Sequence, residues 1–415
     1  MKSFTTANLY LYRILHTIQV LLTTEAVDMK HILLITAWMP LSALAADLDT
    51  VYFYQTPTPE LASTHSSQAY TNPLPAPDTS NLEPDGTPKN TQAGASTEAA
   101  SRAYGRYSVP FTAKRVSAAV TSAVSSSSNA YLSASFPYSA IGKLTFQVGG
   151  ISAHCSASVI LKSVIVTAAH CMQDYGAGAD RFDSHVFRPA SYEGSSPYGE
   201  WTPLAAVWPN TWTKGTEVGS GSAVDNDLAV MILAKNASGQ FISDLVGGHL
   251  NYGWNNYSFI NSKRTGNIWT AAVTTLGYPG LLDEGAIMQR SDGPSYLTTI
   301  ADAHQIYQGS TFTGGSSGGP WVVNFGYENP SFSDGSGVGH KAKANVVIGV
   351  TSWGSADPNQ PKDNYSSQFT QNKRYPKADY GGFGAGNIAA LLNTACSKKP
   401  RGSTQTFKQL GYCDQ

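Results

Sequence analysis

The sequence predicts an all-β protein of antiparallel strands, and three observations lead to this fold class. Beyond Tyr131, short runs of β-branched and aromatic residues alternate with Gly, Pro, Asn and Ser, which is typical of strands joined by turns. Charged residues make up 13% of the 415 positions, whereas soluble domains usually contain about 25%. A convincing helical pattern occurs in one segment alone, 388–395. These features favour a loop-rich barrel or sandwich outside the cell.

The expected strands are short apolar runs bounded by turn residues. They are residues 144–148, 157–161, 164–167, 228–233, 271–276, 321–323 and 346–351. The expected helix, 388–395, follows a glycine-rich stretch and runs directly into Cys396. A disulfide from Cys396 to Cys413 would therefore fix the C-terminal tail, residues 397–415.

The N-terminal part of the sequence predicts export. An apolar run, 32–41, follows Lys30 and His31 and precedes Ala43-Leu44-Ala45. The run is too short to span a bilayer, and its flanks are those of a signal peptide at 29–45. Residues 1–28 are then an upstream extension, with Met29 as the true start. We expect a secreted protein, extracellular or periplasmic, without stable membrane insertion.

Residues 46–130 are expected to be a propeptide or a disordered segment. Between positions 55 and 101 the sequence is rich in Pro, Ser, Thr and Ala, and Tyr70 is its only aromatic residue. Such a stretch cannot bury enough apolar surface to fold alone. The dibasic pair Lys114-Arg115 and the serine-rich run that follows it suggest processing between Arg115 and Tyr131.

Four cysteines in an exported chain predict two disulfides. The pairs that we expect are Cys155 with Cys171 and Cys396 with Cys413, whose members lie 16 and 17 positions apart. Neither pair has the CxxC spacing of a compact zinc site. The sequence shows no dense cluster of acidic or amide ligands, so we expect no metal and no cofactor, although a peripheral calcium site is left open.

The charge of the chain excludes two classes of partner. Its formal net charge at pH 7 is −1, which provides no basic surface for nucleic acid or for an anionic membrane. We expect a monomer that acts on protein or peptide substrates.

Three motifs carry the predicted chemistry. The strand at 164–167 runs into Ala168-Ala169-His170, which aims the histidine from a strand end as a general base. Asp227 opens the strand at 228–233, where its carboxylate can orient that imidazole. Asp225 is the alternative carboxylate.

The third motif is a glycine-rich turn at 314–320. Ser317 is the candidate nucleophile, and the flanking glycines let the backbone approach a substrate closely. The backbone N–H groups of Gly315 and Ser317 are the expected oxyanion hole, because acyl transfer requires a preorganised pair of donors.

Residues 167–171, 226–229 and 315–320 resemble the three signature motifs of chymotrypsin-like serine peptidases. They occur in the order His, Asp, Ser, whereas α/β-hydrolases and subtilisins have other orders. The resemblance implies two six-stranded antiparallel β-barrels with the triad between them and a C-terminal helix. It covers roughly residues 136–395, within a peptidase domain at 131–396.

Within this family the chain is similar to the bacterial V8-like, or glutamyl endopeptidase, branch. The likeness lies in Phe136–Gly142 at the domain start, in Ser196–Gly199, and in Gly277–Gly280 before the nucleophile.

The resemblance also places the substrate pocket. Its floor falls at Thr311 and its wall at Ser352, Trp353 and Gly354, and none of these is a carboxylate. Cleavage after Lys or Arg is therefore disfavoured, because a buried cation would lack its partner. The V8-like branch uses a pocket histidine beside this wall, where this chain has Thr351 and Ser352, so glutamyl specificity is not supported.

One departure concerns activation. In trypsins the residue before the nucleophile is an Asp that receives the new N-terminal ammonium after cleavage, whereas this chain has Ser316. Latency is expected to come instead from the propeptide covering the cleft or the N-terminus.

The sequence therefore predicts a serine endopeptidase that forms an acyl-enzyme. Ser317 attacks the peptide carbonyl, His170 transfers the proton, and Asp227 orients His170. Two rivals are an inactive binding module on the same fold and an esterase that uses the same triad.

Overall fold

A computed structural model gives the structure of the larger part of this chain. The described residues are 51–56, 68–69, 103, 105–106, 109–117, 131–216, 225–261, 266–298, 304–337, 339, 341–354 and 361–415. The predicted upstream extension and signal peptide lie outside these residues, as do most of the predicted propeptide and residues 118–130, where much of the expected processing region falls.

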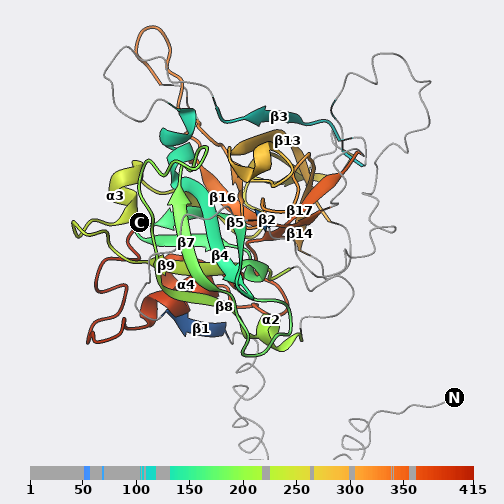
Figure 1. Cartoon of the computed structure of the whole chain (residues 1–415). Helices are drawn as coiled ribbons and strands as arrows, with labels where there is room; N and C mark the ends of the chain where they lie inside the picture. The colour runs from blue at the N-terminus through green and yellow to red at the C-terminus, as the bar shows by residue number, and fades with distance from the viewer. Residues whose placement is uncertain are drawn as a thin grey trace, which may run out of the picture. The chain divides into compact units, whose positions relative to one another are not determined.

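The first of two β-sheets curls into an open barrel (Figure 1). Its strand order is β1-β8-β9-β6-β5-β4-β7, and β2 pairs with β5 in addition. An isolated bridge pairs Phe187 of β7 with Trp201, just before β8. The strands are β1 (Val51–Gln55), β2 (Gln68–Ala69), β4 (Ile141–Val148), β5 (Ile151–Leu161), β6 (Val164–Thr167), β7 (Asp183–Pro189), β8 (Pro203–Pro209) and β9 (Ala229–Leu233).

The second sheet closes on itself, because β12 pairs with β13 as well as with β15. The closed ring is β12-β15-β16-β17-β14-β13, and β3, β10 and β11 pair at its margins. The strands are β3 (Thr112–Arg115), β10 (Asn251–Tyr252), β11 (Ile260–Asn261), β12 (Trp269–Gly277), β13 (Gln289–Leu297), β14 (Gln305–Gly309), β15 (Pro320–Val323), β16 (Val346–Gly354) and β17 (Asp363–Gln368).

Helices are few and short in the described residues. They are α2 (Asn210–Lys214), α3 (Ile242–Val246), α4 (Gly386–Ser397) and the 3-10 helices η3 (Leu132–Ala134), η4 (Tyr138–Ala140), η5 (Ala169–Cys171), η8 (Asp283–Gly285) and η9 (Gly381–Phe383). Within the described part of the chain, no helix has both the length and the apolar character needed to cross a bilayer. Two curled antiparallel sheets with a C-terminal helix confirm the predicted fold class.

Continuous apolar runs explain why the central strands of the first sheet form. All four residues of β6 and all five of β9 are buried, as expected for strands covered on both faces. They pair antiparallel with Thr167 opposite Ala229. The end of β6 and the start of β9 therefore meet at one edge of the sheet.

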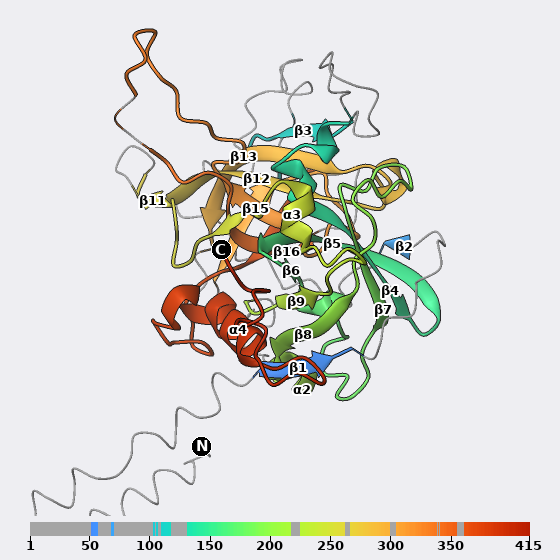
Figure 2. The same cartoon turned by 90° about the vertical axis from the view of Figure 1, so that its left-hand side faces the viewer.

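The C-terminal helix and tail belong to this core. Helix α4 lies beside β8 and β1 (Figure 2), and it buries Ile388, Leu391 and Leu392. The Cys396–Cys413 disulfide ties the tail to the helix, as expected from the sequence. The tail carbonyl of Asp414 then accepts the N–H of Lys162 in the β5–β6 turn.

Three strands, β1, β2 and β3, come from residues 46–130, which the sequence predicts to be a propeptide or a disordered segment. β1 pairs antiparallel with β8, and β3 pairs antiparallel with β13. Val116, which follows β3, is fully buried and donates its N–H to the carbonyl of Met288. The sequence did not predict these strands, because they are short and pair with strands far along the chain. Removal of residues 46–130 as a propeptide stays a prediction.

Candidate active site

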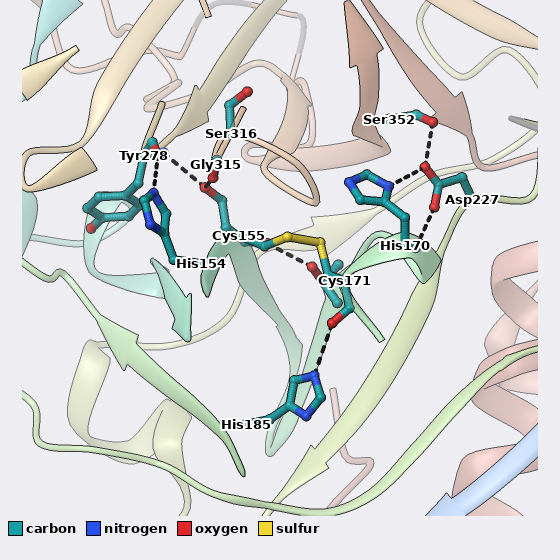
Figure 3. The surroundings of a disulfide bond; sticks show 12 residues. His154, Cys155, His170, Cys171, His185, Asp227, Tyr278, Gly315, Ser316 and Ser352 are labelled. Atoms are coloured by element: carbon teal, nitrogen blue, oxygen red, sulfur yellow. Dashed lines mark hydrogen bonds and ion pairs between the residues drawn. A yellow bond between two sulfur atoms is a disulfide. The ribbon is translucent and has the colours of Figure 1, made fainter. Parts of the chain in front are cut away.

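His170 and Asp227 meet where β6 ends and β9 begins. His170 lies in η5, and its Nδ1 is 2.7 Å from Asp227 Oδ2 (Figure 3). The backbone N–H of His170 donates to Asp227 Oδ1 at 2.9 Å. Both side chains are fully buried. The carboxylate thus holds the ring and the backbone of the same histidine, which fixes the direction of the imidazole.

The second sheet completes the environment of Asp227. Ser352 Oγ, on β16, donates to Asp227 Oδ2 at 2.6 Å, and the N–H of Asp227 donates to Ser367 Oγ, on β17, at 3.1 Å. A buried carboxylate is tolerable only when donors replace water, and this one has three of them. The resemblance predicts Ser352 in the pocket wall, but the sequence does not predict its contact with Asp227, because no local pattern indicates a hydrogen bond between distant strands.

Asp225, the alternative carboxylate, bonds a different histidine. The N–H of His304 donates to Asp225 Oδ1 at 2.9 Å, and the His304 ring nitrogen Nδ1 lies 3.4 Å from Oδ2. Asp227, and not Asp225, thus accepts the hydrogen bond of the His170 imidazole.

The turn that carries Ser317 packs against the segment that leads to His170. The N–H of Gly318 donates to the carbonyl of Thr351 at 2.7 Å. A Cβ atom at Gly318, whose φ is +76°, would overlap Thr167 Oγ1 and lie 2.8 Å from the backbone nitrogen of Ala168. Glycine is therefore required there, and it brings the predicted nucleophile close to the β6 end.

The Cys155–Cys171 disulfide forms beside this site, as expected. Cys171 directly follows His170, and its carbonyl lies 3.0 Å from His185 Nε2 (Figure 3). Among the described residues, the one cluster of potential metal ligands consists of Cys155, His170 and Cys171. Because both sulfurs are in a disulfide, the cluster offers no thiolate for a metal.

The predicted pocket residues lie on strand β16 and on the loop before the nucleophile. Trp353 stacks on Tyr365 of β17, with ring centroids 3.8 Å apart. Gly354 is opposite Asn364, and a Cβ atom at Gly354 would lie 2.5 Å from Asn364 Nδ2. Thr311 is partly exposed. The buried amide of Asn364 is thus a neighbour of the pocket wall that the sequence analysis did not find.

Two curled antiparallel sheets with a buried His–Asp pair where they meet define the class of chymotrypsin-like serine peptidases. The Trypsin family model matches residues 129–375, more than half of the chain. The chain therefore belongs to the trypsin family, and its function is of the serine peptidase type.

Three solved protease structures are similar to part of this chain. The protease Anisep from Arthrobacter nicotinovorans is 23% identical over 56% of this chain and 91% of its own, with a TM-score of 0.42. The thermostable serine protease AL20 from an extremophilic microorganism is 21% identical over 56% and 92%, with a TM-score of 0.43. A Glu endopeptidase in complex with MPD is 16% identical over 57% and 88%, with a TM-score of 0.37. No curated protein matches the chain. The family assignment rests on the family model.

The two disulfides should contribute equally to stability but unequally to activity. They close loops of 16 and 17 residues, for which the chain-entropy term is about 3 kcal/mol each. We expect Cys155→Ala/Cys171→Ala and Cys396→Ala/Cys413→Ala to lower the free energy of unfolding in urea by similar amounts. Only the first double variant should have a lower kcat at a temperature where both variants are folded, because its disulfide borders His170. Equal kcat values in the two variants would contradict this.

His185 should make the fold sensitive to acid. Burial lowers its pKa from 6.5 to about 4. Between pH 6.5 and 4 the unfolded chain binds a proton that the folded chain does not, so the free energy of unfolding should fall as the pH falls, by roughly 3 kcal/mol. His185→Gln, which keeps a donor for the Cys171 carbonyl, should remove this dependence. The control is His249→Gln, at a partly exposed position. Identical urea midpoints for wild type and His185→Gln throughout this pH range would refute the assignment.

Proposed function

We propose that this chain is a secreted serine endopeptidase with His170, Asp227 and Ser317 as its catalytic triad. The observation that carries the proposal is the double contact of Asp227 with the ring and the backbone of His170. An imidazole oriented in this way, beside a glycine-flanked serine, is the arrangement that acyl transfer needs.

The proposed reaction proceeds in two stages. Ser317 Oγ attacks the peptide carbonyl, and His170 Nε2 takes its proton and passes it to the leaving amine. A water molecule, deprotonated by the same imidazole, then hydrolyses the acyl-enzyme. Asp227 accepts the Nδ1–H bond throughout, which fixes the tautomer and stabilises the imidazolium that forms in each stage.

The N–H groups of Gly315 and Ser317 are the proposed oxyanion hole. Gly315 has a φ of +94°, a conformation that glycine adopts readily. Two fixed N–H donors aimed at one point stabilise the negative charge that develops on the carbonyl oxygen.

The proposed pocket, formed by Thr311, Trp353 and Gly354, favours uncharged P1 residues. Thr351 and Ser352 stand where the V8-like branch has its pocket histidine, and neither provides a cation. Thr351 Oγ1 accepts the Trp321 indole N–H at 3.0 Å, and Ser352 donates to Asp227. The proposed assignment to the V8-like branch thus depends on the turn motifs and not on a pocket for glutamate.

Export and processing complete the proposal. Two disulfides suit an oxidising compartment, and the signal-peptide pattern at 29–45 agrees with it. A monomer and a removable segment at 46–130 belong to the same proposal.

The first test is digestion of a peptide library by the exported protein, read by mass spectrometry. Wild type should cleave, and Ser317→Ala should lower the rate by roughly 10⁴-fold or more, because the nucleophile is lost. Ser331→Ala, at an exposed serine, is the matched control and should retain activity. Turnover of esters without peptide cleavage would indicate the esterase, and a folded, inactive wild type would indicate the binding module.

The same digestion tests the pocket. Small or apolar residues should dominate at P1, since the proposed pocket residues carry no charge to pair with Lys, Arg or Glu. A strong preference for any of these three at P1, dependent on Ser317, would contradict the proposed pocket while leaving the peptidase intact.

A further inference from the structure

We propose that Ser156 is a positioning residue that shapes the oxyanion hole from the neighbouring strand. The inference rests on the proposed peptidase function. Ser156 lies on β5, is fully buried, and directly follows Cys155 of the active-site disulfide.

All the hydrogen-bonding groups of Ser156 are engaged at the nucleophile turn or at the segments that support it. Its N–H donates to the carbonyl of Ser317 at 2.8 Å. Its Oγ donates to the carbonyl of Gly315 at 2.9 Å and accepts the N–H of Tyr278 at 2.9 Å. Its own carbonyl accepts Thr167 Oγ1, from the strand that leads to His170, at 2.8 Å. Ser156 therefore forms hydrogen bonds with the residues on both sides of Ser316, namely Gly315 and Ser317.

The neighbouring carbonyls of the turn are held by backbone donors. The N–H of Gly280 donates to Gly314 at 2.7 Å. The N–H of Gly319 donates to Ser316 at 2.9 Å. In a trans peptide the C=O and the N–H point in opposite directions. These two bonds thus turn the next N–H groups along the chain, those of Gly315 and Ser317, away from the donors and toward the proposed oxyanion.

The carbonyl of Gly315 differs from these, because its donor is the side chain of Ser156. This peptide group lies between the two oxyanion N–H groups, so its rotation would change the direction of both. Gly315 also has more backbone freedom than the serine that follows it, since glycine has no Cβ to restrict it. The hydroxyl of Ser156 restricts this peptide group at its carbonyl, while the N–H of Ser316 at its other end donates to the carbonyl of Thr313 at 3.2 Å.

The close packing of His154 and of the Tyr278 carbonyl around Gly315 agrees with this role. A Cβ atom at Gly315 would lie 2.5 Å from His154 Nε2 and 2.6 Å from the carbonyl of Tyr278. His154 and Ser156 are alternate residues of β5 and share one face, whereas Cys155 points to the other face and to the disulfide beside His170 (Figure 3). One strand therefore supports the oxyanion turn on one face and the general base on the other.

The test compares Ser156→Ala with Ser158→Ala. Ser158 is equally buried on the same face of β5, and the structure gives its hydroxyl no hydrogen-bond partner among the described residues. We expect Ser156→Ala to lower kcat by about 10- to 100-fold with KM within twofold, and Ser158→Ala to change neither. A peptide aldehyde, whose adduct places an oxyanion in the hole, should lose affinity for Ser156→Ala in the same proportion as kcat/KM. Product peptides should bind both variants as they bind wild type.

Each other outcome decides against the inference. A kcat for Ser156→Ala within twofold of wild type overturns it, and so does a fall of kcat that Ser158→Ala shares. If Ser156→Ala does not fold, Ser156→Thr, which keeps the hydroxyl, must retain kcat within about threefold; a larger loss in folded Ser156→Thr overturns the proposal. If wild type shows no Ser317-dependent hydrolysis, the proposed function fails first and this inference with it, which separates the two failures.

Discussion

The buried carboxylate of Asp227 is the group on which the arrangement of the two sheets depends. An ionised side chain without water needs donors on every side, and these come from the first sheet through His170 and from the second through Ser352. These hydrogen bonds link the two sheets at the site. The requirement that stabilises Asp227 therefore also determines where the imidazole lies with respect to the turn of Ser317.

Strand β5 is the second element that joins the parts of the site. At Cys155 it is linked covalently to the segment of His170, and at Ser156 it bonds the turn of Ser317. Because the side chains of a strand alternate, adjacent residues can serve different neighbours without competing. The proposed base and the proposed oxyanion donors thus share one rigid support, and disturbance of β5 should affect both.

The sequence predicted the parts of this site whose signals are local. His170, Asp227 and Ser317 each follow or precede an apolar strand or a glycine turn, and both disulfides follow from number and spacing. Strands β13 and β17 are among those that the sequence did not predict, because they are polar; all six residues of β17 are nevertheless buried. Their burial is compensated by tertiary hydrogen bonds, such as that of Ser367 with Asp227. Such bonds, like those of Ser352, join residues far apart in the chain and leave no periodic trace.

Hydrogen bonds within its own loop help to shape the nucleophile turn. Ser316 stands where trypsins have the Asp that binds a new N-terminus, and here its hydroxyl and its N–H both donate to the carbonyl of Thr313, at 2.7 and 3.2 Å. The residue before the nucleophile is therefore anchored within its own loop. Strand β3 meanwhile adds the N-terminal segment to the edge of β13 and buries Val116. Removal of that segment would uncover a sheet edge, whereas the turn has its own bonds. Activation by N-terminal processing would thus not need to create the bonds that anchor Ser316.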